Sequence, residues 1–249
     1  LLRVLEEYTV ECSVLKVFGT ECLDFIADEA LQMLGGYGFL RDYPIERHYR
    51  DSRVNRIFEG TNEINRLLIP GMLARRAAKG QPPLIAAAKA LQDELLGPPS
   101  APPTDVSRLG DEARTVDALR KAALMAFGLA LQTYGQKLAD QQEVVMFIAD
   151  VFMDVFAAES AVLRARAAVE AGGARATWHE DAARAFVNDA ALRVEGNVRQ
   201  ALATMVEGDT LRTMLAAARR LFKSTPINAV ELRRRLADEA VRRGAYPIS

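Results

Sequence analysis

The chain has 249 residues, of which 50% are apolar and 26% charged, so it can bury a sizeable core. Its 32 basic and 33 acidic residues leave a net charge of −1. This composition excludes a disordered chain, a strongly basic nucleic-acid binder and an acidic tail protein. The two cysteines, Cys12 and Cys22, are too few for a disulfide scaffold, so we expect small buried thiols in a cytoplasmic protein.

Residues 1–34 carry apolar side chains at helical spacing, which predicts a long amphipathic helix with one buried face. The residues expected on that face are Leu1, Leu5, Tyr8, Cys12, Leu15, Phe18, Cys22, Phe25, Ile26, Leu31 and Leu34. Gly35 and Gly36 should end the helix, since glycine accepts the left-handed backbone of a helix C-terminus. Because the helical pattern already runs at Leu1, where no Met stands, we expect a fragment of a longer chain.

The next stretch, residues 39–58, is charged, and Pro44 can open a short helix there at its first turn. Thr61 is a candidate N-cap for a helix over residues 62–79. Pro70 should kink or interrupt that helix, because it lacks a backbone N–H and clashes with the preceding turn.

The pattern of residues 84–96 predicts a short amphipathic helix. Its apolar face either packs against the rest of the protein or contacts a membrane surface. A Pro-rich linker over residues 97–103 follows. We therefore expect three parts: residues 1–80, residues 81–106 with this short helix and linker, and residues 107–249.

Every segment from residue 107 onward has helical spacing. The predicted helices cover residues 107–138, 140–171, 177–206, 208–223 and 226–243. Residues 144–156 are apolar on most faces and should form the central helix of this part. Strict alternation persists nowhere, so the sequence predicts an all-α fold of helical bundles. No apolar run approaches the roughly 20 residues that a bilayer requires.

Little in the sequence favours a metal site. His48 and His179 lie far apart, and the cysteines lack zinc spacing, so no metal is expected. Residues 212–243 hold nine Arg or Lys and three Asp or Glu. We interpret this stretch as a solvated face, with a phosphate, a partner or an anionic lipid surface as the alternative.

Four short motifs follow one another between Gln32 and Arg66. They are Q-x-x-G-G-x-G at residues 32–38, Y-P-x-E-R at 43–47, R-D at 50–51 and F-E-G-T at 58–61. In this order they resemble the C-terminal helical domain of acyl-CoA dehydrogenases, and the resemblance covers about residues 8–76. The helices that follow resemble the extra C-terminal domain of the very-long-chain branch and its bacterial relatives.

The resemblance implies an FAD-dependent enzyme that converts a fatty acyl-CoA to a trans-2-enoyl-CoA in fatty acid β-oxidation. Glu59 would be the base that removes the α-proton while the β-hydride passes to the flavin. A carboxylate in a dry pocket suits this task, because desolvation raises its pKa and strengthens it as a base. Phe58 and Gly60 would contact the substrate, and the backbone N–H of Glu59 would help to polarise the thioester oxygen.

The resemblance also assigns residues to the cofactor. Gln32, Gly35 and Gly36 match the segment that contacts the adenine side of FAD bound mainly by a neighbouring subunit. Thr61 matches a threonine that binds the FAD pyrophosphate at a helix N-terminus, where an anion is stabilised. Glu63 stands where several relatives have a glutamine that touches the cofactor.

The resemblance also implies a homodimer and an electron-transfer flavoprotein as electron acceptor. We expect a cytoplasmic location, with peripheral contact with the membrane left open. Two other functions stay open: an acyl-CoA oxidase-like enzyme that O₂ reoxidises, and a non-catalytic helical module for assembly or dimerisation. Arg50 and Asp51 are expected to form a structural ion pair rather than a catalytic one.

Overall fold

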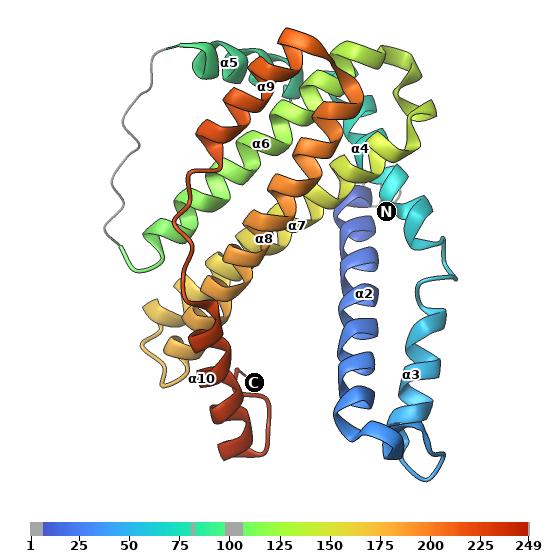
Figure 1. Ribbon diagram of the computed structural model, residues 1–249, viewed down its shortest axis with the longest axis vertical. Helices are drawn as coiled ribbons and strands as arrows, with labels where there is room; N and C mark the ends of the chain where they lie inside the picture. Colours follow the sequence, from blue (N-terminus) through green and yellow to red (C-terminus); the bar gives the residue numbers. More distant parts are fainter. Residues whose placement is uncertain (1–6, 81–82, 98–106, 249) are drawn as a thin grey trace.

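The computed structural model describes residues 7–80, 83–97 and 107–248. All regular structure in these ranges is helical and none of it is strand, which confirms the predicted all-α fold (Figure 1). Within the same ranges, no helix combines the length and the apolar character needed to cross a membrane.

The first part of the chain forms helices α2 (Thr9–Leu34), α3 (Pro44–Val54) and α4 (Asn62–Ala78), with a 3₁₀ turn, η1 (Gly35–Phe39), after α2. The long α2 packs along α4, and α3 runs beside the distal half of α2 (Figure 1). As predicted, Pro44 opens α3, and the side chain of Thr61 caps α4.

The second part forms α5 (Leu84–Leu96), α6 (Gly110–Tyr134), η2 (Gly135–Asp140), α7 (Gln142–Glu170), α8 (Ala176–Met205), α9 (Gly208–Leu221) and α10 (Ala229–Arg243). Long helices α6, α7 and α8 form its body, α5 and α9 cover one end, and α10 packs on α8 (Figure 1). The predicted central segment lies in α7, which contacts α4, α6 and α8.

Two apolar clusters hold the helices together. The larger cluster contains residues of all five helices from α5 to α9, and its fully buried side chains include Phe127, Leu119, Ile148 and Leu202. The smaller cluster joins α2, α4 and α7 through Val10, Val14, Val17, Ile69, Ala149 and Met153. The second cluster therefore ties the first part of the chain to the helix at the centre of the second.

The predicted buried face of α2 is wrong in most of its residues. The buried residues of α2 are Val10, Ser13, Val14, Val17 and Ala27, whereas the exposed ones include Tyr8, Leu15, Phe25, Ile26 and Leu34. Cys12 and Cys22 are also exposed rather than buried. The reason is that the apolar cluster with α4 and α7 forms on the side of α2 that carries Val10, Val14 and Val17, which is not the predicted side. Leu1 and Leu5 lie outside the described residues.

Of the two effects predicted for Pro70, a kink or an interruption, the interruption is wrong, because α4 continues through Pro70 to Ala78. Ile69 and Pro70 are both buried, so packing of this turn offsets the loss of one backbone hydrogen bond. The helix predicted at residues 84–96 is confirmed. Leu91 and Leu95 of this helix are buried, which accounts for its apolar face by packing. The linker predicted at residues 97–103 lies almost wholly outside the described residues.

Candidate functional site

The turn between α3 and α4 has an unusual backbone. Glu59 adopts φ 56° and Gly60 adopts φ 81°, so two consecutive residues lie in the left-handed region. Glycine occupies that region freely, but a residue with a Cβ loses about 1–2 kcal/mol there. In the described residues, Glu59 and Leu109 are the non-glycine residues with positive φ. Strain of this kind persists where the surroundings enforce it, and it is concentrated at functional sites.

Hydrogen bonds from two helices hold this turn in place. Lys16 Nζ, from α2, donates to the Gly60 carbonyl oxygen at 2.8 Å. Asn65 Nδ2, from α4, donates to the same oxygen at 2.8 Å and to the Thr61 carbonyl oxygen at 3.1 Å. Thr61 Oγ1 accepts from the Ile64 N–H at 3.3 Å and closes the first turn of α4. Side chains of α2 and α4 therefore both hold the strained turn in place.

Asn62 lies at the centre of this support and is fully buried. Its Oδ1 accepts from Lys16 Nζ at 2.7 Å, and its Nδ2 donates to Glu21 Oε1 at 3.1 Å. Thr20 Oγ1 also bonds the Asn62 amide. Sequence reasoning missed Lys16, Asn62 and Asn65, although two asparagines at the start of a helix that is otherwise rich in apolar residues were a usable signal.

Arg66 extends the network from α4 to α2 and α7. Its two terminal nitrogens donate to the Glu21 carboxylate at 2.7 and 2.8 Å, and its Nε donates to Asp150 Oδ1 at 2.7 Å. Burial opposes the charge of Arg66, but the hydrogen bonds to Glu21 and Asp150 raise its pKa above the ordinary value. Burial likewise works against ionised Glu21, yet Arg66 and Asn62 hold the pKa of Glu21 below its ordinary value.

The predicted substrate residues Phe58, Glu59 and Gly60 are all exposed. The dry pocket expected around Glu59 is therefore not built by the described residues. The Glu59 N–H donates to no group in the described part of the chain, so its hydrogen-bonding capacity is available to a ligand.

The three glycines of the Q-x-x-G-G-x-G motif differ in their backbone conformation and in the space around them. Gly35 adopts φ 56° and ends α2 as predicted. A Cβ on Gly38 would lie 2.6 Å from the Leu31 carbonyl oxygen, so packing requires glycine there. Gly36 has neither a positive φ nor any heavy atom within 4 Å of an added Cβ. Gly36 therefore presents open backbone, and like Gln32 it is exposed.

The predicted cofactor residues form two separate groups. Gln32, Gly35 and Gly36 lie at the C-terminal end of α2, whereas Thr61 and Glu63 lie beside Lys16 of the same helix. The helix separates the two groups by about 24 Å at about 1.5 Å per residue. Glu63 is exposed, and its pKa is lowered by its own backbone N–H and by the Thr61 hydroxyl.

Comparison with known proteins identifies the family. Residues 3–91 and residues 118–220 each match a model described as "Acyl-CoA dehydrogenase, C-terminal domain". A probable acyl-CoA dehydrogenase of Bacillus subtilis is 45% identical over 95% of the chain. The crystal structure of an acyl-CoA dehydrogenase complexed with FAD from Bacillus anthracis is 41% identical over 95% of the chain, with a TM-score of 0.90.

The chain belongs to the acyl-CoA dehydrogenase family. It spans 40% of the length of both Bacillus relatives. A shorter match, to bovine mitochondrial isobutyryl-CoA dehydrogenase, is 50% identical over 26% of the chain and 15% of the relative. The F-E-G-T turn, the glycine motif and the Arg66 network therefore belong to an acyl-CoA dehydrogenase C-terminal region.

Two charge predictions are resolved by the ion pairs. Arg50 pairs with Glu46 at 3.4 Å rather than with Asp51, because neighbouring residues on a helix point in different directions. Most of the cations in the basic stretch have partners within the chain: Arg212, Arg220, Arg233, Arg235, Arg242 and Arg243. This pairing supports the interpretation of the stretch as a solvated face.

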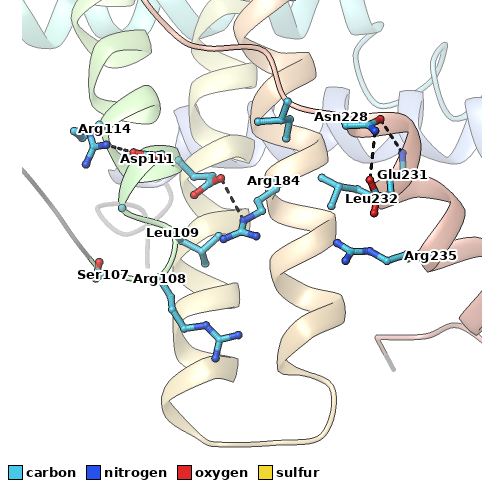
Figure 2. Close-up of a pocket in the computed structure, with 13 residues that line it drawn as sticks. Ser107, Arg108, Leu109, Asp111, Arg114, Arg184, Asn228, Glu231, Leu232 and Arg235 are labelled. Carbon is cyan, nitrogen blue, oxygen red and sulfur yellow. Dashed lines mark hydrogen bonds and ion pairs between the residues drawn. The ribbon is translucent and has the colours of Figure 1, made fainter.

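A cavity of about 640 Å³ lies between the start of α6, α8 and α10 (Figure 2). Arg108, Arg184 and Arg235 line it, but each pairs with a carboxylate, those of Glu180, Glu112 and Asp181 respectively. Its arginines are thus neutralised by the protein itself. No lining residue comes from α2 to α4, so the cavity is separate from the F-E-G-T turn.

Proposed function

We propose that this chain supplies the catalytic base of an FAD-dependent acyl-CoA dehydrogenase, which converts a fatty acyl-CoA to a trans-2-enoyl-CoA. Glu59 is that base. The observation that carries the proposal is the left-handed backbone of Glu59, an energetically costly conformation that the hydrogen bonds of Lys16 and Asn65 enforce. The fold does not need a glutamate at a position that favours glycine, whereas the chemistry does.

The reaction requires a proton to leave the carbon next to a thioester carbonyl. Glu59 presents a carboxylate on a short exposed turn, where it can approach a substrate held against this face. As the proton leaves, negative charge develops on the thioester oxygen, and a hydrogen-bond donor must stabilise it. The Glu59 N–H can supply such a donor, since it is engaged by no described residue. Phe58 and Gly60 flank the base and would contact the substrate.

The residues present fit FAD. Thr61 caps the N-terminus of α4, where backbone N–H groups favour a phosphate, and Glu63 lies in the same first turn. Gly36 has open space beside its backbone, and Gln32 is exposed one turn away. The solved Bacillus anthracis relative is complexed with FAD. When bound, FAD would accept the two electrons of the reaction.

The separation of the two groups of cofactor residues supports a homodimer. Thr61 and Glu63 would contact one FAD, while Gln32, Gly35 and Gly36 would contact the FAD of the neighbouring subunit. Large apolar side chains near both groups are exposed in the described chain, as expected of surfaces that ligands or other protein segments cover. They include Met33, Tyr37, Phe39, Leu40, Ile57 and Phe58.

The electron acceptor is an electron-transfer flavoprotein, and oxygen consumption by the reduced enzyme would instead identify the oxidase-like alternative. The chain divides into residues 1–80, 81–106 and 107–249. Membrane contact by α5 is not favoured, because its buried Leu91 and Leu95 face α6 and α9.

The test is Glu59→Gln in the FAD-loaded intact enzyme, mixed with acyl-CoA without oxygen while flavin absorbance is followed. The rate constant of flavin reduction should fall by about 10³-fold or more, because the amide cannot take the proton. Flavin content should stay unchanged. The control, Glu143→Gln, removes an exposed carboxylate at the start of α7 and should leave the rate intact. Rapid flavin reduction in Glu59→Gln would refute the proposal.

A further inference from the structure

We propose that Asp150, which lies in the matched segment of residues 118–220, is a positioning residue that acts through Arg66. It positions the F-E-G-T turn at residues 58–61, which we call the Glu59 turn. The inference rests on the proposed function only for its effect on the rate. The contacts themselves join three helices, α2, α4 and α7, and end at the carbonyl oxygen of Gly60.

Arg66 is the residue through which Asp150 acts. Only 13% of its side chain is exposed, and its guanidinium lies between the carboxylates of Glu21 and Asp150. The contact with Glu21 is bidentate, which fixes the plane of the guanidinium as well as its position. Asp150 takes the remaining Nε–H. Without Asp150, that donor would be left half-buried without a partner, and Arg66 would have to turn toward water.

Glu21 links Arg66 to the turn through hydrogen bonds. Its Oε1 accepts from Arg66 and from Asn62 Nδ2, so a shift of Arg66 changes the partner of a fully buried amide. The other end of that amide, Asn62 Oδ1, holds Lys16 Nζ, which donates to the Gly60 carbonyl oxygen. A part-buried network of this kind has few alternative arrangements, so the loss of one member affects the others. Glu59 immediately precedes Gly60, and its left-handed backbone depends on this support.

α7 offers a matched control for Asp150. Asp154 lies one turn further along the same helix and also pairs with an arginine, Arg193 of α8. Burial raises the pKa of both aspartates, so their environments are comparable. Arg193, however, lies over the Phe186 ring and makes no contact with the Glu59 turn. Removal of Asp154 therefore tests the loss of an ion pair on α7 without removal of a hydrogen-bond partner of Arg66.

The experiment compares Asp150→Ala, Asp150→Glu and Asp154→Ala in the intact FAD-loaded enzyme. Asp150→Ala should slow flavin reduction by acyl-CoA about tenfold, the size of a typical coupling between residues in one network. The acyl-CoA concentration at half-saturation should stay within about twofold, because no substrate contact is removed. Asp150→Glu, which keeps a carboxylate for Arg66, should recover most of the rate, and Asp154→Ala should retain it.

Amide hydrogen exchange supplies a readout that does not depend on turnover. In the same enzymes, peptides covering residues 58–66 should exchange faster in Asp150→Ala than in Asp154→Ala. Equal exchange and equal rates in these two variants would overturn the proposal, whether both are normal or both impaired. Failure of the proposed function would be seen separately, as flavin reduction that survives Glu59→Gln while the exchange difference at residues 58–66 persists.

Discussion

The rings of Phe18 and Phe186 meet edge to face, with their centroids 6.0 Å apart. Phe18 belongs to α2 and Phe186 to α8, so this contact joins the segments matched by the two family models. Arg193 lies over the same Phe186 ring at 5.5 Å from its centroid. Together with the apolar cluster of α2, α4 and α7, the pair makes the two parts pack as one structure.

A double-mutant cycle on these two rings should measure that coupling. Phe18→Leu and Phe186→Leu keep apolar volume but remove the edge-to-face geometry. We expect a coupling energy of about 1 kcal/mol between them in urea unfolding, beyond the loss from each single variant. Strictly additive effects would show that the rings stabilise the chain independently.

Substitution of the strained Glu59, the proposed base, should reveal a conflict between stability and catalysis. Glu59→Gly and Glu59→Ala both remove the carboxylate, but only glycine relieves the left-handed backbone at φ 56°. Relief of about 1–2 kcal/mol is partly offset by the greater freedom of glycine in the unfolded chain, about 0.5–1 kcal/mol. Chemical denaturation should therefore find Glu59→Gly more stable than Glu59→Ala by about 0.5–1 kcal/mol. A less stable glycine variant would contradict the strain.

Gly36 and Gly38 should respond differently to alanine. A Cβ at Gly38 would meet the Leu31 carbonyl oxygen at 2.6 Å, so Gly38→Ala should destabilise the fold by about 1–3 kcal/mol. A Cβ at Gly36 meets no heavy atom within 4 Å, so Gly36→Ala should unfold like the wild type. In the intact enzyme, Gly36→Ala should instead weaken FAD retention, measured by flavin release on dilution. Normal FAD retention would remove Gly36 from the cofactor site.

The ion pairs of α10 predict a pH-dependent stability. Hydrogen bonds from Arg242 and then Arg243, together with their charges, lower the pKa of Glu239 from 4.5 to about 2 although burial opposes this. A lowered folded-state pKa stabilises the protein above the ordinary pKa and loses that effect as pH falls toward the folded value. Glu239→Gln should thus melt below the wild type at neutral pH, and the difference should shrink as pH falls below about 4.

Asp181, on the neighbouring helix α8, has a pKa shift of the opposite sign. Burial raises its pKa, although Arg235 and Arg184 oppose the shift. A raised folded-state pKa means that the native protein holds the proton more tightly, so stability falls as pH rises through this range. Relative to the wild type, Asp181→Asn should gain stability as the pH rises above 3.8, the ordinary pKa of an aspartate, which is the reverse of Glu239→Gln. Parallel pH profiles for the two variants would show that the shifts have another cause.

Local patterns in the sequence sufficed for the helices and for the motifs. Helical spacing, Pro44, the Thr61 cap and the Gly35 stop act over one or two turns, and the structure confirms each of them. The F-E-G-T turn was recognisable for the same reason, because four adjacent residues carry it. The prediction of Glu59 as the base rests on that motif and stays a prediction.

Tertiary structure alone decided which faces are buried and which charges meet. Apolar periodicity marks a stripe on α2 but does not say where its neighbours lie, so Cys12, Cys22 and Phe25 were assigned to a core that forms on the other side. The long-range pairings that support the Glu59 turn were equally out of reach. Lys16 and Gly60, or Arg66 and Asp150, are distant in sequence, and hydrogen bonds between such residues depend on how the helices pack rather than on any local pattern.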